Sequence, residues 1–251
     1  MIFSAMVDKR KEDFMIYVLS DIHGNTERYN SIIQQINLQE SDTLYVLGDV
    51  IDRYPDGIKI LREIMKKDNI KMLLGNHEYM MLNTIDSEYK LDEYEYNNLL
   101  RLWYRNGGMV THNYIKHIRK ELRKEIYDYL RKLPINIKIE VNGKRFLLVH
   151  GSPEENYSWI HREYETKEKF AVWERWQPTD AIPEGYILIF GHTPTIHFQD
   201  KDPIEIWQGE NAIGIDCGCG FPKSQFEGET MGRLACLRLD DMKVFYSKEE
   251  G

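Results

Sequence analysis

The sequence predicts an α/β fold with a helical insert. Three observations support this: the order of elements in the first third, a change to β pattern after Pro134, and polar clusters at the ends of apolar runs. In the first third, short apolar runs alternate with stretches of helical periodicity, an order typical of a parallel sheet with crossover helices. The expected strands span residues 16–19, 44–47 and 70–74, and the expected helices span residues 26–36 and 57–65.

The remaining chain divides into a helical stretch and a β-rich stretch. Residues 79–133 are rich in Tyr, Leu, Glu, Lys and Arg at helical spacing, broken at Asn106-Gly107-Gly108. They predict two or more helices packed on the sheet, as plain scaffold or as one wall of a substrate groove. After Pro134, Asn142-Gly143 predicts a hairpin turn. Strands are expected at 135–141, 145–149, 186–190, 204–206, 212–215, 234–239 and 244–246.

The domain organisation is expected to be simple. The sequence has no internal repeat, low-complexity tract or evident linker, which favours a single domain over residues 15–251. Residues 1–14 form an N-terminal extension with mixed charges and without the apolar centre of a signal peptide. Met15 stands directly before the first strand, so we interpret residues 1–14 as an alternative start or a disordered extension.

Composition excludes several classes of partner. The 251 residues carry a formal net charge of −8 and no basic stripe, which argues against binding of a nucleic-acid polymer. No apolar run approaches the roughly 18 residues that span a membrane. The three cysteines, Cys217, Cys219 and Cys236, are too few for a disulfide framework; we expect buried thiols and a cytoplasmic location. The oligomeric state is not predicted.

Five polar clusters share one pattern, in which an apolar run ends in a side chain able to bind a metal ion or phosphate. Taken singly, each has an ordinary explanation as a turn or a helix cap. Five in this order are hard to obtain by chance. The clusters are Asp21-Ile22-His23-Gly24-Asn25, Gly48-Asp49-Val50-Ile51-Asp52-Arg53, Gly75-Asn76-His77-Glu78, His150-Gly151 and Gly191-His192-Thr193.

These clusters resemble the calcineurin-like metallophosphoesterases, and within them the phosphoprotein phosphatase branch, including its bacterial and phage serine/threonine phosphatases. The branch is marked by the blocks GDxHG, GDxVDRG and GNHE and by two later histidines. The resemblance extends from about Ile16 to the C-terminus, with departures at Ser20 and Tyr54, where the pattern has glycine. It implies a four-layer α/β/β/α sandwich with mixed sheets.

The resemblance also implies a ligand set for two divalent metal ions. Asp21 and His23 would bind the first ion, Asp49 would bridge both, and Asn76, His150 and His192 would complete the second. Mixed carboxylate, imidazole and carbonyl ligands suit Mn²⁺, the expected metal, with Fe or Zn²⁺ as alternatives. Two ions that share a bridging ligand clamp the attacking and leaving oxygens, and a metal-bridging hydroxide would be the nucleophile.

Four further residues are expected to act in catalysis. By resemblance, His77 would protonate the leaving oxygen and Asp52 would orient it, which suits an imidazole kept protonated by a carboxylate. Arg53, the arginine of the second block, and Arg175, in a Trp-x-Arg segment similar to that of bacterial and phage members, would bind the phosphate. The remaining histidines, His112, His117, His161 and His197, are interpreted as structural or surface residues.

The favoured function is a metal-dependent phosphatase that hydrolyses phosphomonoesters, foremost phosphoserine and phosphothreonine in proteins. The alternative is a dinucleotide-polyphosphate hydrolase of the diadenosine tetraphosphatase type, which shares these blocks; a hydrolase of small phosphorylated molecules would look much the same. A non-catalytic scaffold of the same fold is a third hypothesis, which the complete set of ligand positions disfavours.

Overall fold

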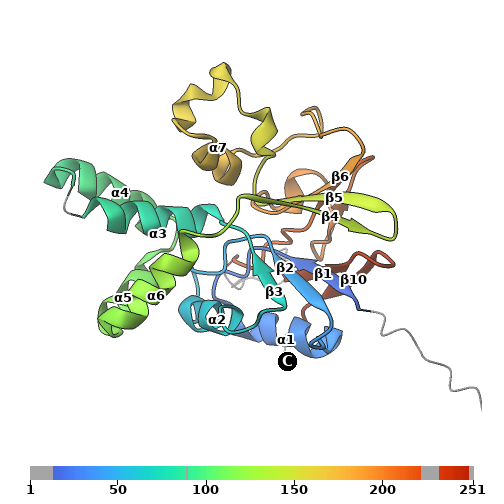
Figure 1. Ribbon diagram of the computed structural model, residues 1–251, viewed down its shortest axis with the longest axis horizontal. Coiled ribbons are helices and arrows are strands. Elements are labelled where there is room, and N and C mark those ends of the chain that lie inside the picture. The colour runs from blue at the N-terminus through green and yellow to red at the C-terminus, as the bar shows by residue number, and fades with distance from the viewer. Residues whose placement is uncertain (1–13, 89, 222–231, 249–251) are drawn as a thin grey trace, which may run out of the picture.

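Two mixed β-sheets form the centre of the computed structural model, which describes residues 14–88, 90–221 and 232–248 (Figure 1). In the first sheet the strand order is β10 (Lys243–Tyr246), β9 (Ala235–Arg238), β1 (Ile16–Leu19), β2 (Thr43–Val46) and β3 (Ile70–Met72). In the second it is β4 (Asn136–Val141), β5 (Lys144–Val149), β6 (Tyr186–Phe190), β8 (Ala212–Gly214) and β7 (Trp207–Gln208).

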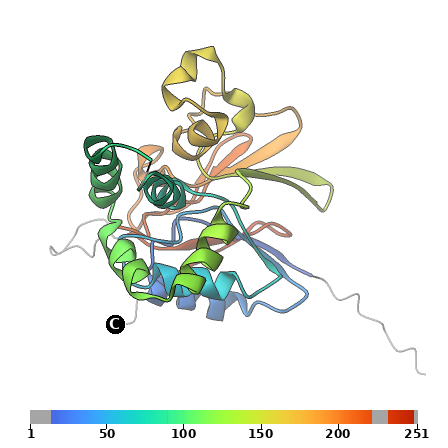
Figure 2. The same ribbon diagram turned by 60° about the vertical axis from the view of Figure 1, so that its left-hand side comes forward.

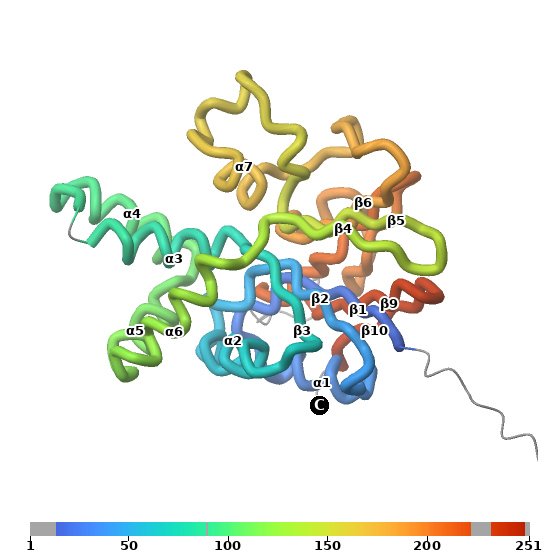
Figure 3. Tube along the Cα trace, viewed as in Figure 1, coloured from blue at the N-terminus to red at the C-terminus, as the bar shows by residue number. Residues whose placement is uncertain are grey.

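Each sheet combines parallel and antiparallel strand pairs. β1, β2 and β3 are parallel in the first sheet, and β5, β6 and β8 are parallel in the second. β9 returns to the first sheet from the far end of the chain and lies antiparallel to β1 (Figure 3). The predicted α/β class with mixed sheets is therefore confirmed.

The two sheets pack face to face, and the alternation of side chains along β1 shows how. Ile16 and Val18 point into a cluster shared with the second sheet, which contributes Phe146, Leu148 and Ile189. Neighbouring residues of a strand point to opposite faces. Tyr17 and Leu19 accordingly belong to the cluster on the helix-covered side of the first sheet.

Helices cover the outer faces unequally. α1 (Thr26–Ile36), capped by the Asn25 side chain, and α2 (Gly57–Ile64) lie beneath the first sheet (Figure 1). α7 (Lys167–Trp173) lies on the far side of the second sheet. Much of that outer face is covered by aromatic side chains, among them Trp176 and Trp207. Three short 3-10 helices follow strands of the second sheet: η1 (Glu154–Asn156) and η2 (Trp159–Tyr164) after β5, and η3 (Thr195–His197) after β6.

Four helices lie in the described part of the stretch expected to be a helical insert. They are α3 (Asn76–Ser87), α4 (Glu93–Arg105), α5 (Met109–His117) and α6 (Lys120–Leu130). α3 and α4 pack against each other and project beside the sheets, whereas α5 contacts α2 (Figures 1 and 2). The break predicted at Asn106-Gly107-Gly108 separates α4 from α5. Among the described residues, no helix is long and apolar enough to cross a membrane.

The prediction of a strand at residues 204–206 is wrong. The backbone groups of these residues form hydrogen bonds with side chains instead of with another strand. The Glu205 carbonyl accepts hydrogen bonds from Thr195 Oγ1 and Gln199 Nε2. The Ile206 N–H donates to the Tyr246 hydroxyl over 3.1 Å. Ile204 and Ile206 are still buried between the sheets, which explains the apolar pattern. The strand β7 begins one residue later.

Two smaller predictions concern cysteines and the N-terminus. All three cysteines are buried and free, as predicted. Phe14 is exposed, and the rest of the predicted N-terminal extension, residues 1–13, lies outside the described residues.

Candidate metal centre

The polar clusters predicted from the sequence meet at one edge of the two sheets. β1, β2 and β3 end just before Asp21, Asp49 and Asn76, and in the second sheet β5 and β6 end just before His150 and His192. All five strands belong to the parallel parts of their sheets, and parallel strands present their carboxyl ends at the same edge. The six predicted ligands are all buried.

One group of possible metal ligands lies near Asp49 Oδ2. His23 Nε2 lies 3.8 Å from this oxygen and His77 Nε2 lies 3.7 Å from it. The Asp21 carboxylate faces the same nitrogen of His23, with Oδ1 3.9 Å from Nε2. His23, Asp49 and His77 each offer one ligand atom within 4.8 Å of the others. The sequence expected Asp21, and not His77, as the partner of His23 here.

A second group shares the other oxygen of Asp49. His150 Nε2 lies 3.4 Å from Asp49 Oδ1 and 2.9 Å from Asn76 Oδ1. His192 completes this group, whose ligand atoms again lie within 4.8 Å of one another. Asp49 is the carboxylate common to both groups, which is the arrangement needed for a bridging ligand.

Backbone carbonyls fix the orientation of three histidines. His150 Nδ1 donates to the Leu47 carbonyl oxygen over 2.8 Å, and His23 Nδ1 donates to the Ile51 carbonyl oxygen over 3.3 Å. His192 Nε2 donates to the Trp173 carbonyl oxygen over 3.0 Å. A neutral imidazole has one N–H, so its other nitrogen presents a lone pair. For His150 and His23 that nitrogen is the Nε2 that faces the carboxylates described above.

The electrostatics of the centre fit bound cations. Burial lowers the pKa of His23 and of His192 well below the usual range, and the positive charges of neighbouring groups add to this effect. These rings are therefore neutral, as metal ligation requires. Burial raises the pKa of Asp49, and the carboxylates of Asp21 and Glu78 raise it further against the opposing effect of His77. Two divalent cations would compensate the negative charge of carboxylates that lie close together in a buried site.

Strained backbone is concentrated at this centre. Of the ten non-glycine residues with positive φ in the described parts of the chain, six are site residues. Such conformations cost about 1–3 kcal/mol each and cluster at functional sites. They are Asp21, His23, Asp49, Asp52, Arg53 and His192. Tyr54, which replaces a glycine of the family pattern, is not among them; the preceding Arg53 has φ 66° instead.

Glu78 is a supporting residue whose role the sequence analysis did not identify. Its carboxylate is fully buried and accepts hydrogen bonds from the backbone N–H groups of Asp49, Val50 and Gly75, at 2.9, 2.9 and 3.2 Å. It thereby ties the loop after β2 to the start of α3. Gly75 must be small because an added Cβ would lie 2.3 Å from Asp49 Oδ1.

His77 and Asp52 form the pair predicted for proton transfer. Asp52 Oδ2 accepts a hydrogen bond from His77 Nδ1 over 2.7 Å, and both side chains are buried. Burial lowers the pKa of His77, but the carboxylates of Asp49 and Asp52 outweigh it and raise the net pKa. A second donor that the sequence did not predict, Trp103 Nε1 on α4, reaches the same Asp52 oxygen at 2.9 Å.

Trp103→Phe should lower kcat about tenfold and leave the metal content unchanged. The substitution keeps the ring in the core but removes one hydrogen bond to the Asp52 carboxylate, an interaction with a charged group worth about 1.5 kcal/mol or more. Steady-state kinetics and elemental analysis of the purified variant measure both quantities. Trp207→Phe, in the cluster outside the second sheet, is the control. An unchanged kcat would show that Trp103 does not position Asp52.

The two predicted arginines lie at the rim of the centre. Arg53 is exposed and lies close to His23. Both side chains border Gly220, where an added Cβ would lie 2.3 Å from His23 Cδ2 and 2.6 Å from Arg53 Nη1. Arg175 Nη1 donates to the His192 carbonyl oxygen over 3.0 Å. All ten predicted site residues are thus brought to one region. The arginines lie where solvent has access, as a phosphate-binding group must.

The fold and the two His/Asp groups define a metallophosphoesterase. A model of the calcineurin-like phosphoesterase family matches residues 14–216, and the chain therefore belongs to that family. Members of this family depend on a pair of metal ions, in agreement with the two groups of ligands.

Relatives and solved structures add detail to this assignment. The chain is 40% identical to a symmetrical bis(5'-nucleosyl)-tetraphosphatase of Wigglesworthia glossinidia brevipalpis, over 93% of this chain and 99% of that relative. A crystal structure of a putative diadenosine tetraphosphatase is similar with a TM-score of 0.59 at 17% identity and covers 94% of each chain. A serine/threonine phosphatase from Saccharomyces cerevisiae is similar with a TM-score of 0.52 at 14% identity and covers 95% of this chain and 81% of that one. At these identities, the two structures show the fold alone.

Proposed function

We propose that this protein hydrolyses dinucleoside polyphosphates of the diadenosine tetraphosphate type, symmetrically, to two nucleoside diphosphates. The motif pattern alone favours phosphoproteins as substrates and gives this activity as the alternative. The 40% identity to a symmetrical tetraphosphatase, over nearly the whole of both chains, supports the alternative better.

A pocket beside the metal centre is the observation that carries the proposal. It has a volume of about 700 Å³, within the range of small-molecule sites, and begins at Arg53. Arg105, exposed at the end of α4, supplies a second guanidinium, and Tyr54 and Phe221 supply aromatic rings. Two arginines suit a chain of phosphates, and aromatic rings suit a nucleobase. A nucleoside polyphosphate extending from the centre would meet both kinds of group.

The residues around the centre would then divide the chemistry. When bound, the metal ions would supply positive charge to the phosphate oxygens and activate water. Arg53 would hold the phosphate chain as it leaves the centre, and Arg175 would hold it on the side of His192. His77, oriented by Asp52, would deliver a proton to the departing nucleoside diphosphate.

Side-by-side assays of two substrates test the proposal. The Mn²⁺-supplemented protein is given diadenosine tetraphosphate or phosphoserine and phosphothreonine peptides, and the products are separated by chromatography. We expect faster turnover of the dinucleotide, with ADP as the only nucleotide product. Products of ATP and AMP would contradict symmetrical cleavage, and faster release of phosphate from the peptides would restore the phosphoprotein as the preferred substrate.

Two arginine variants on α4 test the pocket. Arg105→Gln should raise the KM for diadenosine tetraphosphate about tenfold, because it removes a charged partner of the phosphate chain. The KM for p-nitrophenyl phosphate, which has a single phosphate and no phosphate chain, should stay the same. Arg101→Gln, one turn earlier on α4, exposed and outside the pocket, is the matched control. Equal effects of the two variants would show that the pocket does not bind the substrate.

A further inference from the structure

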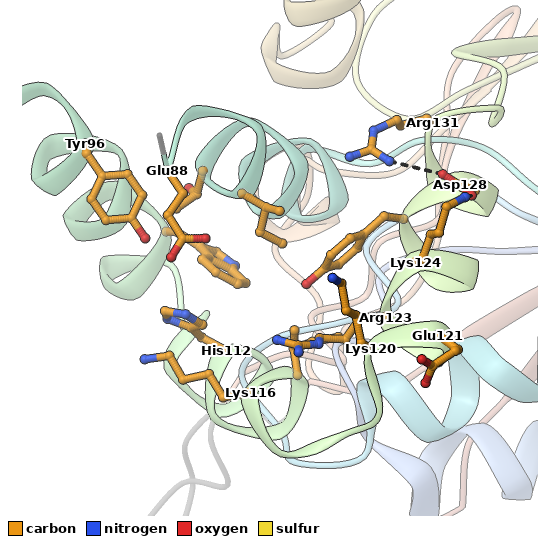
Figure 4. A pocket seen from close by; sticks show the side chains of 15 residues that line it. Glu88, Tyr96, His112, Lys116, Lys120, Glu121, Arg123, Lys124, Asp128 and Arg131 are labelled. Carbon is orange, nitrogen blue, oxygen red and sulfur yellow. Dashed lines mark hydrogen bonds and ion pairs between the residues drawn. The ribbon is translucent and has the colours of Figure 1, made fainter. Parts of the chain in front are cut away.

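A second cavity lies inside the helical insert, away from the metal ligands. It has a volume of about 680 Å³ and is bounded by α3, α4, α5 and α6 (Figure 4). Its size is that of a site for a small organic ligand. The proposed substrate pocket has no lining residue in common with it.

The cavity combines positive charge with aromatic rings. Lys116 from α5 and Lys120 and Arg123 from α6 reach its wall, where Figure 4 shows Lys120 and Arg123 side by side. Tyr127 supplies a partly exposed aromatic ring, and the buried Trp103 borders the cavity. Cations beside aromatic faces suit a ligand with a planar ring and an anionic group.

The acidic groups at the cavity leave part of this positive charge available. Asp128 is occupied by ion pairs with Lys124 and Arg131, at 2.5 and 3.3 Å. Glu88 and Glu121 are exposed at opposite ends of the cavity (Figure 4). The centre of the wall therefore retains the cationic groups of α6.

Within the described part of the chain, the Arg123 side chain has one unpaired donor at this wall. Its Nε–H is buried and has no hydrogen-bond partner among the residues that the structure describes. An unpaired buried donor on a charged group costs about 1–3 kcal/mol or more, so such atoms are rare in folded proteins. An anion in the cavity would satisfy this donor.

Two contacts connect the cavity to the catalytic pair. The ring of Trp103 lines the cavity, and its Nε1 donates to Asp52 Oδ2. Thr111 Oγ1 on α5 accepts a hydrogen bond from the Asp52 backbone N–H over 3.1 Å. The next residue, His112, lines the cavity with its ring centroid 5.2 Å from that of Trp103. A ligand between α4 and α5 would thus contact both elements that hold Asp52.

From this geometry we infer that the cavity is a regulatory binding site for a nucleoside phosphate, which acts on catalysis by fixing Trp103 against Asp52. The planar base would lie against Tyr127, next to the buried Trp103, and the phosphates would bind Arg123 and Lys120. Because Asp52 orients His77, a bound nucleotide is expected to raise kcat. The inference concerns binding outside the metal centre and does not depend on which phosphoester the protein hydrolyses.

Calorimetric titration with ADP tests the binding site. Arg123→Gln should weaken one ADP-binding event about tenfold, as should Lys120→Gln, which changes an exposed residue and tests the same site if the first variant folds poorly. Arg119→Gln, exposed one turn before Arg123 and outside the cavity lining, is the matched control. Arg105→Gln should weaken only binding in the proposed substrate pocket, which separates failure of this inference from failure of the proposed function.

The specificity of the cavity is tested with fragments. Adenosine lacks the phosphates and pyrophosphate lacks the base, so each should bind at least tenfold more weakly than ADP. Octanoate tests an apolar anion without an aromatic ring. Tighter binding of octanoate, or equal binding of ADP to the wild type and to Arg123→Gln and Lys120→Gln, would overturn the assignment.

Kinetics with p-nitrophenyl phosphate test the regulation. Competition by ADP at the metal centre raises only the KM, whereas an effect through Trp103 changes kcat at saturating substrate. We expect ADP to raise kcat about twofold in the wild type and in Arg119→Gln, and to leave kcat unchanged in Arg123→Gln. A purely competitive effect in the wild type would overturn the regulatory role.

Discussion

Asp49→Asn should abolish the binding of both metal ions and lower kcat about a thousandfold. Asp49 is the one residue common to the two groups of ligands, and each of its carboxylate oxygens faces one of them. The amide is neutral and offers a single oxygen, so it cannot compensate two cations. Loss of metal-ion catalysis is worth several kcal/mol, and about 4 kcal/mol corresponds to a thousandfold change in rate.

Metal content and thermal unfolding measure this effect independently of activity. The wild type should bind two equivalents of Mn²⁺ and show a higher Tm with Mn²⁺ than without it, because a ligand that binds only the folded state stabilises it. Asp49→Asn should show neither property. Asp68→Asn, an exposed aspartate before β3, is the control for the change of charge. Two equivalents of Mn²⁺ in Asp49→Asn would exclude Asp49 as the bridging ligand.

Much of the metal centre could be predicted because the ligands follow strand ends. The apolar runs before Asp21, Asp49, Asn76, His150 and His192 are visible in the sequence, and each overlaps a strand. A parallel sheet then brings the carboxyl ends together without any further information. Strand patterns alone do not predict that two separate sheets converge on one site. That expectation rests on the resemblance to the family.

Contacts that depend on tertiary packing could not be predicted. Glu78 lies in a recognised block, but nothing in the spacing shows that its carboxylate binds the backbone after β2. Trp103 stands 51 residues from Asp52, in a stretch whose periodicity indicates only a helix. The signal that could have suggested Trp103 is its chemistry, since a buried indole N–H requires an acceptor.

The substrate was the least predictable property. The blocks predict metal binding, whereas the proposed substrate pocket is formed by residues from three regions, around Arg53, Arg105 and Phe221. No periodicity connects these regions, and the loop geometry that joins them depends on positive φ at Arg53 and Gly107. Similar chemistry on one fold can therefore serve different phosphoesters.

His77→Asn should slow hydrolysis by about a hundredfold for substrates with poor leaving groups and much less for substrates with good ones. General acid catalysis contributes roughly 10²–10⁴-fold, and the contribution grows with the basicity of the departing oxygen. Asn is close to His in size but cannot donate a titrating proton. Phenyl phosphate, whose phenol resembles the Tyr side chain with a pKa of about 10, should suffer more than p-nitrophenyl phosphate, whose phenol is more acidic.

The same variant distinguishes a general acid from a metal ligand. His77 Nε2 lies 3.7 Å from Asp49 Oδ2, within one of the two groups that could hold an ion, so the geometry permits both roles. A general acid leaves two equivalents of Mn²⁺ bound when it is replaced. The hydrogen bond from His77 Nδ1 to Asp52 fits both roles, because a carboxylate orients a metal-binding ring and also raises the pKa of a general acid. Loss of one equivalent in His77→Asn, but not in the exposed control His117→Asn, would make His77 a ligand.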